Sequence, residues 1–185
     1  LEKFVEHEFY GPLGLTHTAF KPLDKYNGND IVPTEDDTLF RKQLLKGYVH
    51  DPACALLGGV AGHAGLFSNA QEVAVLFQML LNGGIYNGKR VLGRNTVDMM
   101  ITNQIGELPY GNQDKFGLGF SLITDKSQGR TPANTGTFAW GGAFATSYWV
   151  DPNEKMVYLF FRQLQNTTKG EMVEKFRAMV YQAIQ

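Results

Sequence analysis

The segment "TFAWGGAFATSYWVDP" (residues 137–152) predicts the antiparallel sheet around which the rest of the chain is organised. Two runs rich in aromatic and β-branched residues, 136–142 and 144–150, have the composition of β-strands. Asp151 and Pro152 follow the second run and suit the first and second positions of a type I turn. The second run is therefore expected to form an antiparallel hairpin with the strand that comes after the turn.

Neighbouring segments extend this sheet and cover it. "FGLGFSLI" (116–123) predicts a further strand, and "MVYLFFRQ" (156–163) supplies the second arm of the hairpin. Residues 156–161 are apolar without alternation, so both faces of this strand are expected to be buried. A closing helix over 171–184 is expected to pack across the sheet. Its apolar stripe consists of Met172, Val173, Phe176, Met179, Val180, Ala183 and Ile184.

The first part of the chain is predicted to be irregular between helices. Residues 1–10 have helical periodicity that is expected to end at Gly11 and the proline after it. Turn-forming residues interrupt 11–60, and so long an irregular segment usually serves as a functional or wrapping loop. The next helix is predicted to begin at a capping box made by Ser68 and Gln71.

Short elements link this helix to the sheet. Asn82 and the two glycines after it are expected to end the helix. Asn87-Gly88 predicts a tight hairpin, and Asn95 is expected to cap a short helix. Helices, then an antiparallel meander and a closing helix, predict an α+β fold in which helices pack on an antiparallel sheet.

Composition limits the function classes. The 185 residues are 43% hydrophobic with a net charge of −1, which fits a globular domain, or part of one, and does not indicate nucleic-acid binding. No apolar run has the length of a membrane span. Cys54 lies between alanines and is interpreted as a small buried residue. The chain begins at Leu1 without a leader, so it is expected to be processed or truncated.

Few residues outside the sheet suggest catalysis. The four serines lie in neither Gly-x-Ser-x-Gly nor Ser-x-x-Lys, so no nucleophilic serine is expected within the chain. His50, Asp51 and His63 allow a metal-site hypothesis, but their spacing matches no usual metal motif. The alternative is that they bind loop backbone, with His63 facing a cleft. Tyr110-Gly111-Asn112 has a Tyr-x-Asn form but is interpreted as a surface turn.

The paired glycines at 141 and 142 are the main candidate site. Glycine within a strand commonly marks a bulge or the close approach of another group. Without side chains here, a ligand could lie beside the strand and receive a hydrogen bond from the Ala143 N–H. Together with a second donor, this N–H would form an oxyanion hole. The alternative is that the glycines only allow a helix to pack against the strand.

Two longer segments resemble a known family. "GGVAGHAGLFSNAQEVAVLFQMLLNGG" (58–84) followed by "WGGAFATSYWVDP" (140–152) is similar to the C-terminal half of serine β-lactamase-fold hydrolases. This group includes class C β-lactamases, penicillin-binding DD-peptidases and related esterases. "FYGPLGLTHTAF" (9–20) resembles the phrase that follows the second catalytic motif of the family, and "GLGF" (117–120) resembles the strand before the third. The resemblance covers nearly the whole chain.

The resemblance implies a partial β-lactamase/transpeptidase-like fold, with residues 1–185 as the C-terminal part of one domain. Trp140, Gly141 and Gly142 correspond to the third motif, usually Lys-Thr-Gly or His-Thr-Gly, in a form like the esterase branch. The Ala143 N–H would be the second oxyanion donor. The opposite wall of the substrate site would be formed by Gly62, His63 and Ala64. Because tryptophan stands at position 140, the cation that commonly pairs with a β-lactam carboxylate is absent from this motif. The Ser-x-x-Lys motif of the family would lie before Leu1.

The expected function is therefore acyl transfer or hydrolysis of an ester, peptide or β-lactam through an acyl-enzyme, with this chain inactive by itself. The alternative is a non-catalytic binding module of the same fold, for cell-wall fragments or as an appendage of a larger enzyme. No cofactor or metal is implied. Expected partners are a small acyl substrate, and either the N-terminal part of the protein or a second copy paired through strand 156–163. The resemblance implies a periplasmic, secreted or envelope-anchored protein.

Overall fold

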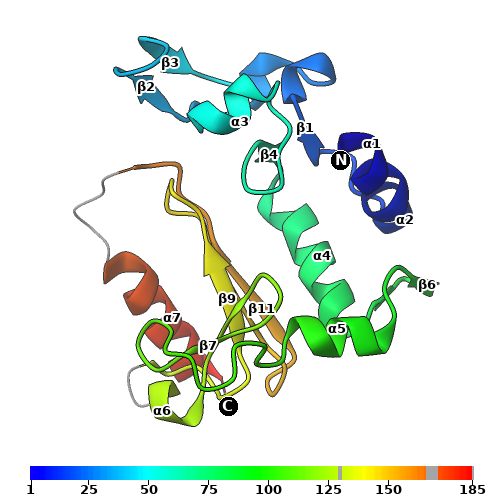
Figure 1. Ribbon diagram of the computed structural model, residues 1–185, viewed down its shortest axis with the longest axis vertical. Helices are drawn as coiled ribbons and strands as arrows, with labels where there is room; N and C mark the ends of the chain where they lie inside the picture. Colours follow the sequence, from blue (N-terminus) through cyan, green and yellow to red (C-terminus); the bar gives the residue numbers. More distant parts are fainter. Residues whose placement is uncertain (129–130, 166–170, 185) are drawn as a thin grey trace. The chain divides into compact units, whose positions relative to one another are not determined.

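A computed structural model describes residues 1–128, 131–165 and 171–184 of the chain (Figure 1). The chain divides into two compact units. Unit 1 comprises Leu1–Leu76 with Gln163–Gln165, and unit 2 comprises Phe77–Arg162 with the described part of Asn166–Gln185. None of the helices in the described ranges is long and apolar enough to cross a membrane.

An antiparallel sheet forms the centre of unit 2, as predicted, with its strands in the order β11-β10-β9-β8-β7. The predicted single strand over 116–123 is wrong, because a turn divides it into β7 and β8. Gly119 in this turn has a φ of 95°, and a Cβ at Gly117 would overlap the carbonyl oxygen of Met100. The strands are β7 (Lys115–Phe116), β8 (Ser121–Leu122), β9 (Phe138–Gly141), β10 (Ser147–Asp151) and β11 (Met156–Phe160).

The predicted hairpin between β10 and β11 is confirmed. Asp151 pairs with Met156 at its closed end. The Asp151 carboxylate is fully buried and accepts hydrogen bonds from the backbone N–H groups of Asn153 (2.9 Å) and Glu154 (3.2 Å). It also accepts one from the hydroxyl of Tyr181 at 2.6 Å. One carboxylate thus closes the hairpin and ties it to the C-terminal helix.

That helix, α7 (Glu171–Ala183), packs across one face of the sheet as predicted (Figure 1). The Phe176 ring lies 5.0 Å from Phe160 and 5.9 Å from Trp149. The predicted stripe is wrong in part, since Met172, Met179 and Ala183 are exposed. Arg177 and Tyr181 take their place: the Arg177 guanidinium lies 4.8 Å from the centre of the Trp149 ring. Amphipathic side chains therefore supply packing that the apolar pattern did not include.

The other face of the sheet forms a second aromatic core. Phe77, from the C-terminal part of α4 (Ala70–Leu81), lies 4.1 Å from the Tyr148 ring and 6.4 Å from Phe120. Burial raises the pKa of Tyr148 above its ordinary range. The remaining unit 2 elements are β5 (Ile85–Tyr86), β6 (Lys89–Arg90), α5 (Arg94–Met100) and α6 (Asp125–Gln128).

Strand β11 lies at the edge of the described sheet. The expectation that both its faces are buried is wrong, because among residues 156–161 only Tyr158 is buried. The difference arises because β11 has a neighbouring strand, β10, along one edge only, so side chains of the sheet flank β11 on that edge alone. The edge has no charge or proline between Met156 and Phe160 to prevent pairing with another strand.

We therefore expect the chain to self-associate through β11 at micromolar concentration. Phe161→Lys, at the exposed position directly after this strand, should shift the population towards monomer because a charge opposes edge pairing. Met179→Lys places the same charge at an exposed position on α7 and should leave association unchanged. Sedimentation velocity distinguishes the two variants. A clean monomer for the unmodified chain would contradict the prediction.

Unit 1 consists of short elements, as the sequence predicted for 11–60. It contains α1 (Glu2–Val5), a π-helical turn (Glu6–Tyr10), α2 (Gly11–Leu13), β1 (Ala19–Phe20), 3-10 turns at Pro22–Asp24 and Gly28–Asp30, β2 (Glu35–Asp37), β3 (Gln43–Leu45), α3 (Pro52–Leu56) and β4 (Leu66–Phe67). The first helix was expected to end at Gly11 but continues to Leu13. Gly14 ends the helix with a φ of 72°, and the Leu15 N–H donates to the Tyr10 carbonyl across this end.

Two predicted helix caps are wrong by one or two residues. Asn69, not Ser68, caps α4: its Oδ1 accepts the Glu72 N–H at 2.9 Å. The Ser68 hydroxyl is instead 2.7 Å from the hydroxyl of Thr18. The predicted cap Asn95 lies inside α5, which begins after Gly93. The predicted hairpin at Asn87-Gly88 is confirmed, with both residues at positive φ.

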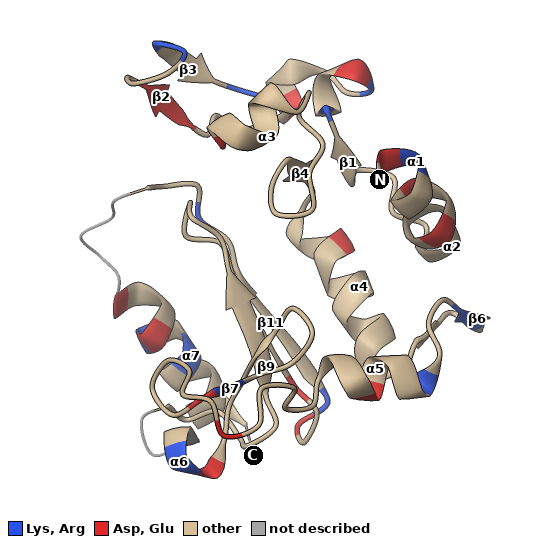
Figure 2. Ribbon diagram, viewed as in Figure 1, with Lys and Arg blue, Asp and Glu red and all other residues tan. Residues whose placement is uncertain are grey.

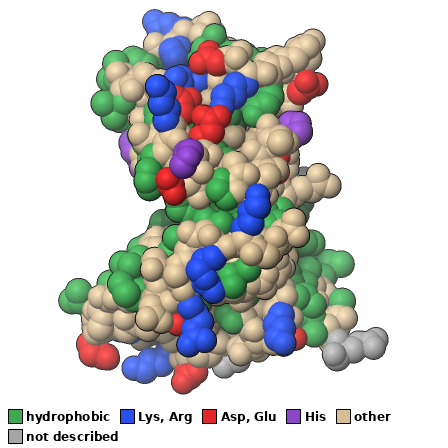
Figure 3. All heavy atoms as spheres, turned by 90° about the vertical axis from the view of Figure 1, so that its right-hand side faces the viewer, with side chains coloured by type: hydrophobic (Ala, Val, Ile, Leu, Met, Phe, Trp, Pro, Cys, Tyr) green, Lys and Arg blue, Asp and Glu red, His purple; other side chains and the backbone are tan. Residues whose placement is uncertain are grey.

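Charged residues of both signs occur in each unit (Figure 2). On the face shown in Figure 3, acidic and basic side chains lie among one another, with apolar side chains between them. This distribution matches the net charge of −1.

Candidate functional site

The candidate site in unit 2 lies where β9 passes into a tight turn. The Gly142 N–H donates to the carbonyl of Thr146 at 2.8 Å, and the Ala145 N–H donates to the carbonyl of Gly142 at 3.0 Å. Ala145 has a φ of 65°. Residues 142–145 therefore form the turn between β9 and β10, and the predicted strand over 144–150 begins three residues later, at Ser147.

The backbone N–H of Ala143 is not used by this turn. Ala143 occupies the second position of the turn and is exposed. Among the hydrogen bonds of residues 1–128, 131–165 and 171–184, none is donated by this N–H. A backbone donor that is held in a turn and left uncommitted can bind an anionic oxygen. The oxyanion-donor role of Ala143 stays a prediction.

The two glycines before Ala143 have a local reason for lacking side chains. A Cβ at Gly142 would overlap the Oγ1 atom of Thr146, and a Cβ at Gly141 would lie 3.1 Å from the Thr146 carbonyl oxygen. The expected open space beside Gly142 is therefore filled by Thr146. Neither alternative from the sequence, a ligand or a helix against the strand, accounts for Gly142.

Trp140 and Gly141 present an unpaired edge on one side. The register of β9 with β8 ends at Ala139, whereas on the other side Trp140 pairs with Tyr148 of β10. The Trp140 side chain is 45% exposed and makes an edge contact with Phe116, at 5.3 Å between ring centres. A hollow of about 360 Å³ reaches Trp140 and Gly141, but neither Gly142 nor Ala143 lines it.

The second group of predicted site residues, Gly62, His63 and Ala64, lies in unit 1 in the loop between α3 and β4. The His63 Nε2 is 3.0 Å from Asp51 Oδ1. Asp51 also caps α3, because the same oxygen accepts the Cys54 N–H at 2.6 Å. This backbone hydrogen bond, and then the one from His63, lower the pKa of the Asp51 carboxyl. The Asp51 carboxylate thus caps the start of α3 and also holds the His63 imidazole by a hydrogen bond.

Cys54 also contacts the loop that carries Gly62, His63 and Ala64. Its side chain is fully buried, as predicted, and its thiol donates to the carbonyl of Ala64 at 3.2 Å. Burial, followed by the nearby charge of Asp51, raises the pKa of the thiol. Cys54 is therefore a structural residue and not a nucleophile. Gly62 is exposed, and a Cβ there would meet no other atom within 4 Å.

The two groups of predicted residues belong to different units, so their meeting in one site stays a prediction. Two of the three residues in the metal-site hypothesis, Asp51 and His63, are hydrogen-bonded to each other. Within the described ranges, no three His, Cys, Asp or Glu side chains are grouped as metal ligands. Tyr110 lies in a surface turn closed by a bridge to Asp114, as the sequence indicated.

The ionised Asp51 carboxylate is expected to stabilise unit 1 near neutral pH. Its pKa is lower in the folded chain than in the unfolded chain, where it is about 3.9. This stabilisation is therefore complete above about pH 5, begins to fall near the unfolded-state pKa and is lost as the pH falls through the lower folded-state pKa. A ¹³C NMR titration of Asp51 should show a midpoint below 3.9 that rises in His63→Gln without reaching 3.9, because the Cys54 N–H remains. An unchanged midpoint would contradict the role of His63.

Sequence reasoning missed two residues that shape these loops. Thr146 was treated only as part of a strand, and its contact with Gly142 has no signal in the sequence. Asp51 was expected either to bind a metal or to bind loop backbone, and its bond from the Cys54 N–H agrees with the second expectation. Its role as a helix cap was missed, although an aspartate directly before Pro52 is typical of a helix start. That signal would have identified it as the cap of α3.

Comparison with known proteins places these features in context. The family described as "Beta-lactamase" matches residues 1–182. A protein of Escherichia coli K12 named "Putative D-alanyl-D-alanine carboxypeptidase" is 34% identical over 168 residues, covering 84% of this chain and 38% of that protein. A protein of the same name from Salmonella typhi is 35% identical over 174 residues, with the same coverage. The chain thus spans less than half the length of these relatives.

Solved structures show the same fold at low identity. Simvastatin synthase (LovD) from Aspergillus terreus has a TM-score of 0.72 at 18% identity, over 100% of this chain and 50% of LovD. EstCE1, described as a hydrolase with promiscuous acyltransferase activity, has a TM-score of 0.66 at 20% identity, over 97% and 50% of the two chains. A β-lactamase from Mycobacterium bovis has a TM-score of 0.62 at 17% identity, over 97% and 54%.

Proposed function

Because this chain belongs to the β-lactamase family, we propose that it is the C-terminal portion of a serine hydrolase that transfers or hydrolyses an acyl group through an acyl-enzyme. Residues 1–185 would be part of one catalytic domain. The observation that supports this most directly is the exposed, uncommitted N–H of Ala143 directly after Trp140-Gly141-Gly142.

In the proposed reaction, a serine oxygen attacks the substrate carbonyl and the carbonyl oxygen becomes an oxyanion. The Ala143 N–H would donate one of the two hydrogen bonds to this oxygen. The leaving group departs with a proton, and water then hydrolyses the acyl-enzyme and restores the serine. Trp140 and Gly141 would form one wall of the acyl site. Gly62, His63 and Ala64 would form the opposite wall.

The proposed nucleophile lies outside these 185 residues, because none of the four serines here is followed three residues later by lysine. The chain alone would supply one oxyanion donor and part of the pocket. Removing the nucleophile from a serine hydrolase leaves only a small residual rate from binding and oxyanion stabilisation. The isolated chain is therefore proposed to be inactive.

The residues of the third motif favour a substrate without a carboxylate beside the scissile bond. Trp140 offers no positive charge at the position where Lys-Thr-Gly or His-Thr-Gly begins. Arg177, which lines the neighbouring hollow, is 3.5 Å from Glu174 and is thereby partly neutralised. An ester with a neutral acyl group is the proposed substrate class. The carboxypeptidase names of the 34–35% identical relatives favour a D-alanyl peptide as the second candidate.

A non-catalytic binding module remains the alternative for the whole protein, for cell-wall fragments or as an appendage of an enzyme. Peptide or cell-wall substrates would place the protein in the periplasm, outside the cell or at the envelope. These two proposals differ in one respect that can be measured, which is the presence of a reactive serine.

The deciding experiment compares this chain with the longer protein that carries it. The longer protein should hydrolyse p-nitrophenyl butyrate with saturation and be labelled by a fluorophosphonate, whereas residues 1–185 should do neither. A diacetyl-lysyl-D-alanyl-D-alanine substrate and a chromogenic cephalosporin test the peptide and β-lactam alternatives in the same samples. A longer protein without labelling or turnover would favour the binding module. Saturable, phosphonate-sensitive turnover by residues 1–185 would contradict the proposed location of the nucleophile.

A further inference from the structure

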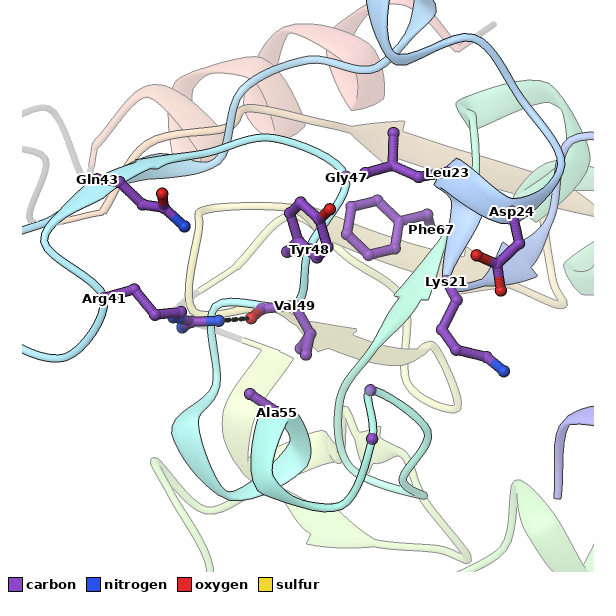
Figure 4. Close-up of a pocket in the computed structure, with 12 residues that line it drawn as sticks. Lys21, Leu23, Asp24, Arg41, Gln43, Gly47, Tyr48, Val49, Ala55 and Phe67 are labelled. Atoms are coloured by element: carbon purple, nitrogen blue, oxygen red, sulfur yellow. Dashed lines mark hydrogen bonds between the residues drawn. The ribbon is translucent and has the colours of Figure 1, made fainter.

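Unit 1 contains a cavity that none of the predicted site residues lines. Its volume is about 390 Å³, and all its lining residues belong to unit 1. It lies among the end of β1, the loop after β3, the helix α3 and the strand β4 (Figure 4). Ligand sites commonly begin at about 300 Å³, so the volume suits a small molecule.

The walls of this cavity are mainly apolar and include two aromatic rings. Tyr48 and Phe67 lie on one side, and Ala55 lies on the opposite side (Figure 4). The backbone of Gly58 continues the wall beside Ala55, and a Cβ at Gly58 would meet no atom within 4 Å. A flat ring would fit between the aromatic pair and this smooth wall, where aromatic contacts add to the burial of apolar surface.

The charged groups around the cavity disfavour an anion. The Lys21 ammonium is 3.0 Å from the Glu2 carboxylate, and the Arg41 Nε is 2.9 Å from the Asp37 carboxylate. Both positive charges are therefore neutralised by partners outside the cavity. Asp24, also on its rim, has no ion pair among the described side chains. The unpaired charge at this site is thus negative.

The cavity wall is held in place by a partly buried hydrogen-bond network. The Asp37 side chain is 5% exposed and accepts the N–H groups of Phe40 at 2.9 Å and Arg41 at 3.0 Å. The Arg41 guanidinium in turn donates to the carbonyls of Val49 and His50. The loop that carries Tyr48 is therefore tied to the hairpin of β2 and β3. Such a fixed wall lowers the ordering cost of binding a ligand.

We propose that this cavity binds a neutral aromatic group that carries an amide. The ring would lie between Tyr48 and Ala55, and the amide would lie at the mouth beside Gln43. The Gln43 side chain points toward the cavity, and its amide both donates and accepts hydrogen bonds (Figure 4). This site does not depend on the acyl-transfer function, because all its residues lie in one unit and its test requires no turnover.

The test uses ¹⁵N-labelled chain 1–185 titrated with phenylacetamide and, separately, with phenylacetate. Phenylacetamide should give saturable shifts of the Gly58, Gly59 and Val49 amides, with a dissociation constant on the order of 1 mM for so small a ligand. Phenylacetate, which has the same ring but a negative charge, should bind at least about tenfold more weakly. Equal binding of the two, or no saturable shift with either, would overturn the proposal.

A matched pair of variants locates the site. Ala55→Phe fills the cavity and should weaken phenylacetamide binding at least about tenfold. Leu56→Phe places the same side chain on the same helix at a position that is 78% exposed, and should leave binding unchanged. If Ala55→Phe does not fold, nuclear Overhauser contacts in the unmodified chain decide. Contacts of the phenyl protons with the Ala55 methyl support the proposal, and contacts elsewhere overturn it.

Discussion

Ala143→Pro in the longer protein should lower kcat for p-nitrophenyl butyrate by about 10²- to 10³-fold, the usual effect of removing one oxyanion donor. Proline lacks the N–H that is proposed to bind the oxyanion. Ala143 is the second residue of the turn closed by the bond from the Ala145 N–H to the Gly142 carbonyl. Proline is favoured at this position of a turn, so the backbone is expected to keep its course.

Ala143→Ser is the matched variant, because it changes the side chain and retains the N–H. Its kcat should stay within a few-fold of the unmodified enzyme. KM should change little in Ala143→Pro, since the lost interaction is made mainly in the transition state. Unchanged turnover by Ala143→Pro, with the hairpin intact by NMR, would remove Ala143 from the proposed mechanism.

Trp149→Ala should lower the free energy of unfolding of unit 2 by about 3–5 kcal/mol, as expected when a buried Trp is truncated. The Trp149 side chain is 1% exposed. Its ring stacks on Tyr158 at 5.1 Å with an interplanar angle of 13°, and it also contacts Phe176 and Arg177. Truncation would leave a cavity between the sheet and α7 that these rings cannot fill.

Two further substitutions test whether the loss of stability in Trp149→Ala comes from its buried position and not from the removal of any tryptophan. Trp140→Ala removes a ring that is 45% exposed, so the loss should be less than about 1.5 kcal/mol. Trp149→Phe should also be milder than Trp149→Ala. The Trp149 indole N–H is buried without a hydrogen-bond partner among the described residues, so phenylalanine loses no such bond. Urea unfolding followed by near-ultraviolet circular dichroism measures all three, and equal losses in Trp149→Ala and Trp140→Ala would contradict the packing argument.

Much of the fold could be predicted because local signals specify it. Asn87-Gly88 has few alternatives to a tight hairpin, and Asp151 closes the next hairpin with its own side chain. The errors occur where a distant residue decides between two acceptable local choices. Ser68 and Asn69 can both cap a helix, and the Thr18 hydroxyl, fifty residues away, lies against Ser68. Likewise, the turn at Gly117 depends on the Met100 carbonyl beside it.

The candidate site was only partly accessible to sequence reasoning. The position of Ala143 after two glycines predicted a special backbone, and the turn found there leaves its N–H uncommitted. The reason for the glycines was not predictable, because it lies in the side chain of Thr146. The unit 1 cavity was also not predictable. Its residues come from segments between Lys21 and Phe67 that share no motif, and only the folded chain brings them together.

The contact between Gly142 and Thr146 has a consequence for engineering this hairpin. In a mutant library that randomises residue 142 while keeping threonine at 146, every new side chain would displace the Thr146 hydroxyl, and losses of activity caused by this displacement would be misread as loss of substrate contacts. Positions 142 and 146 should therefore be changed together, with glycine or alanine at 146 whenever a side chain is introduced at 142.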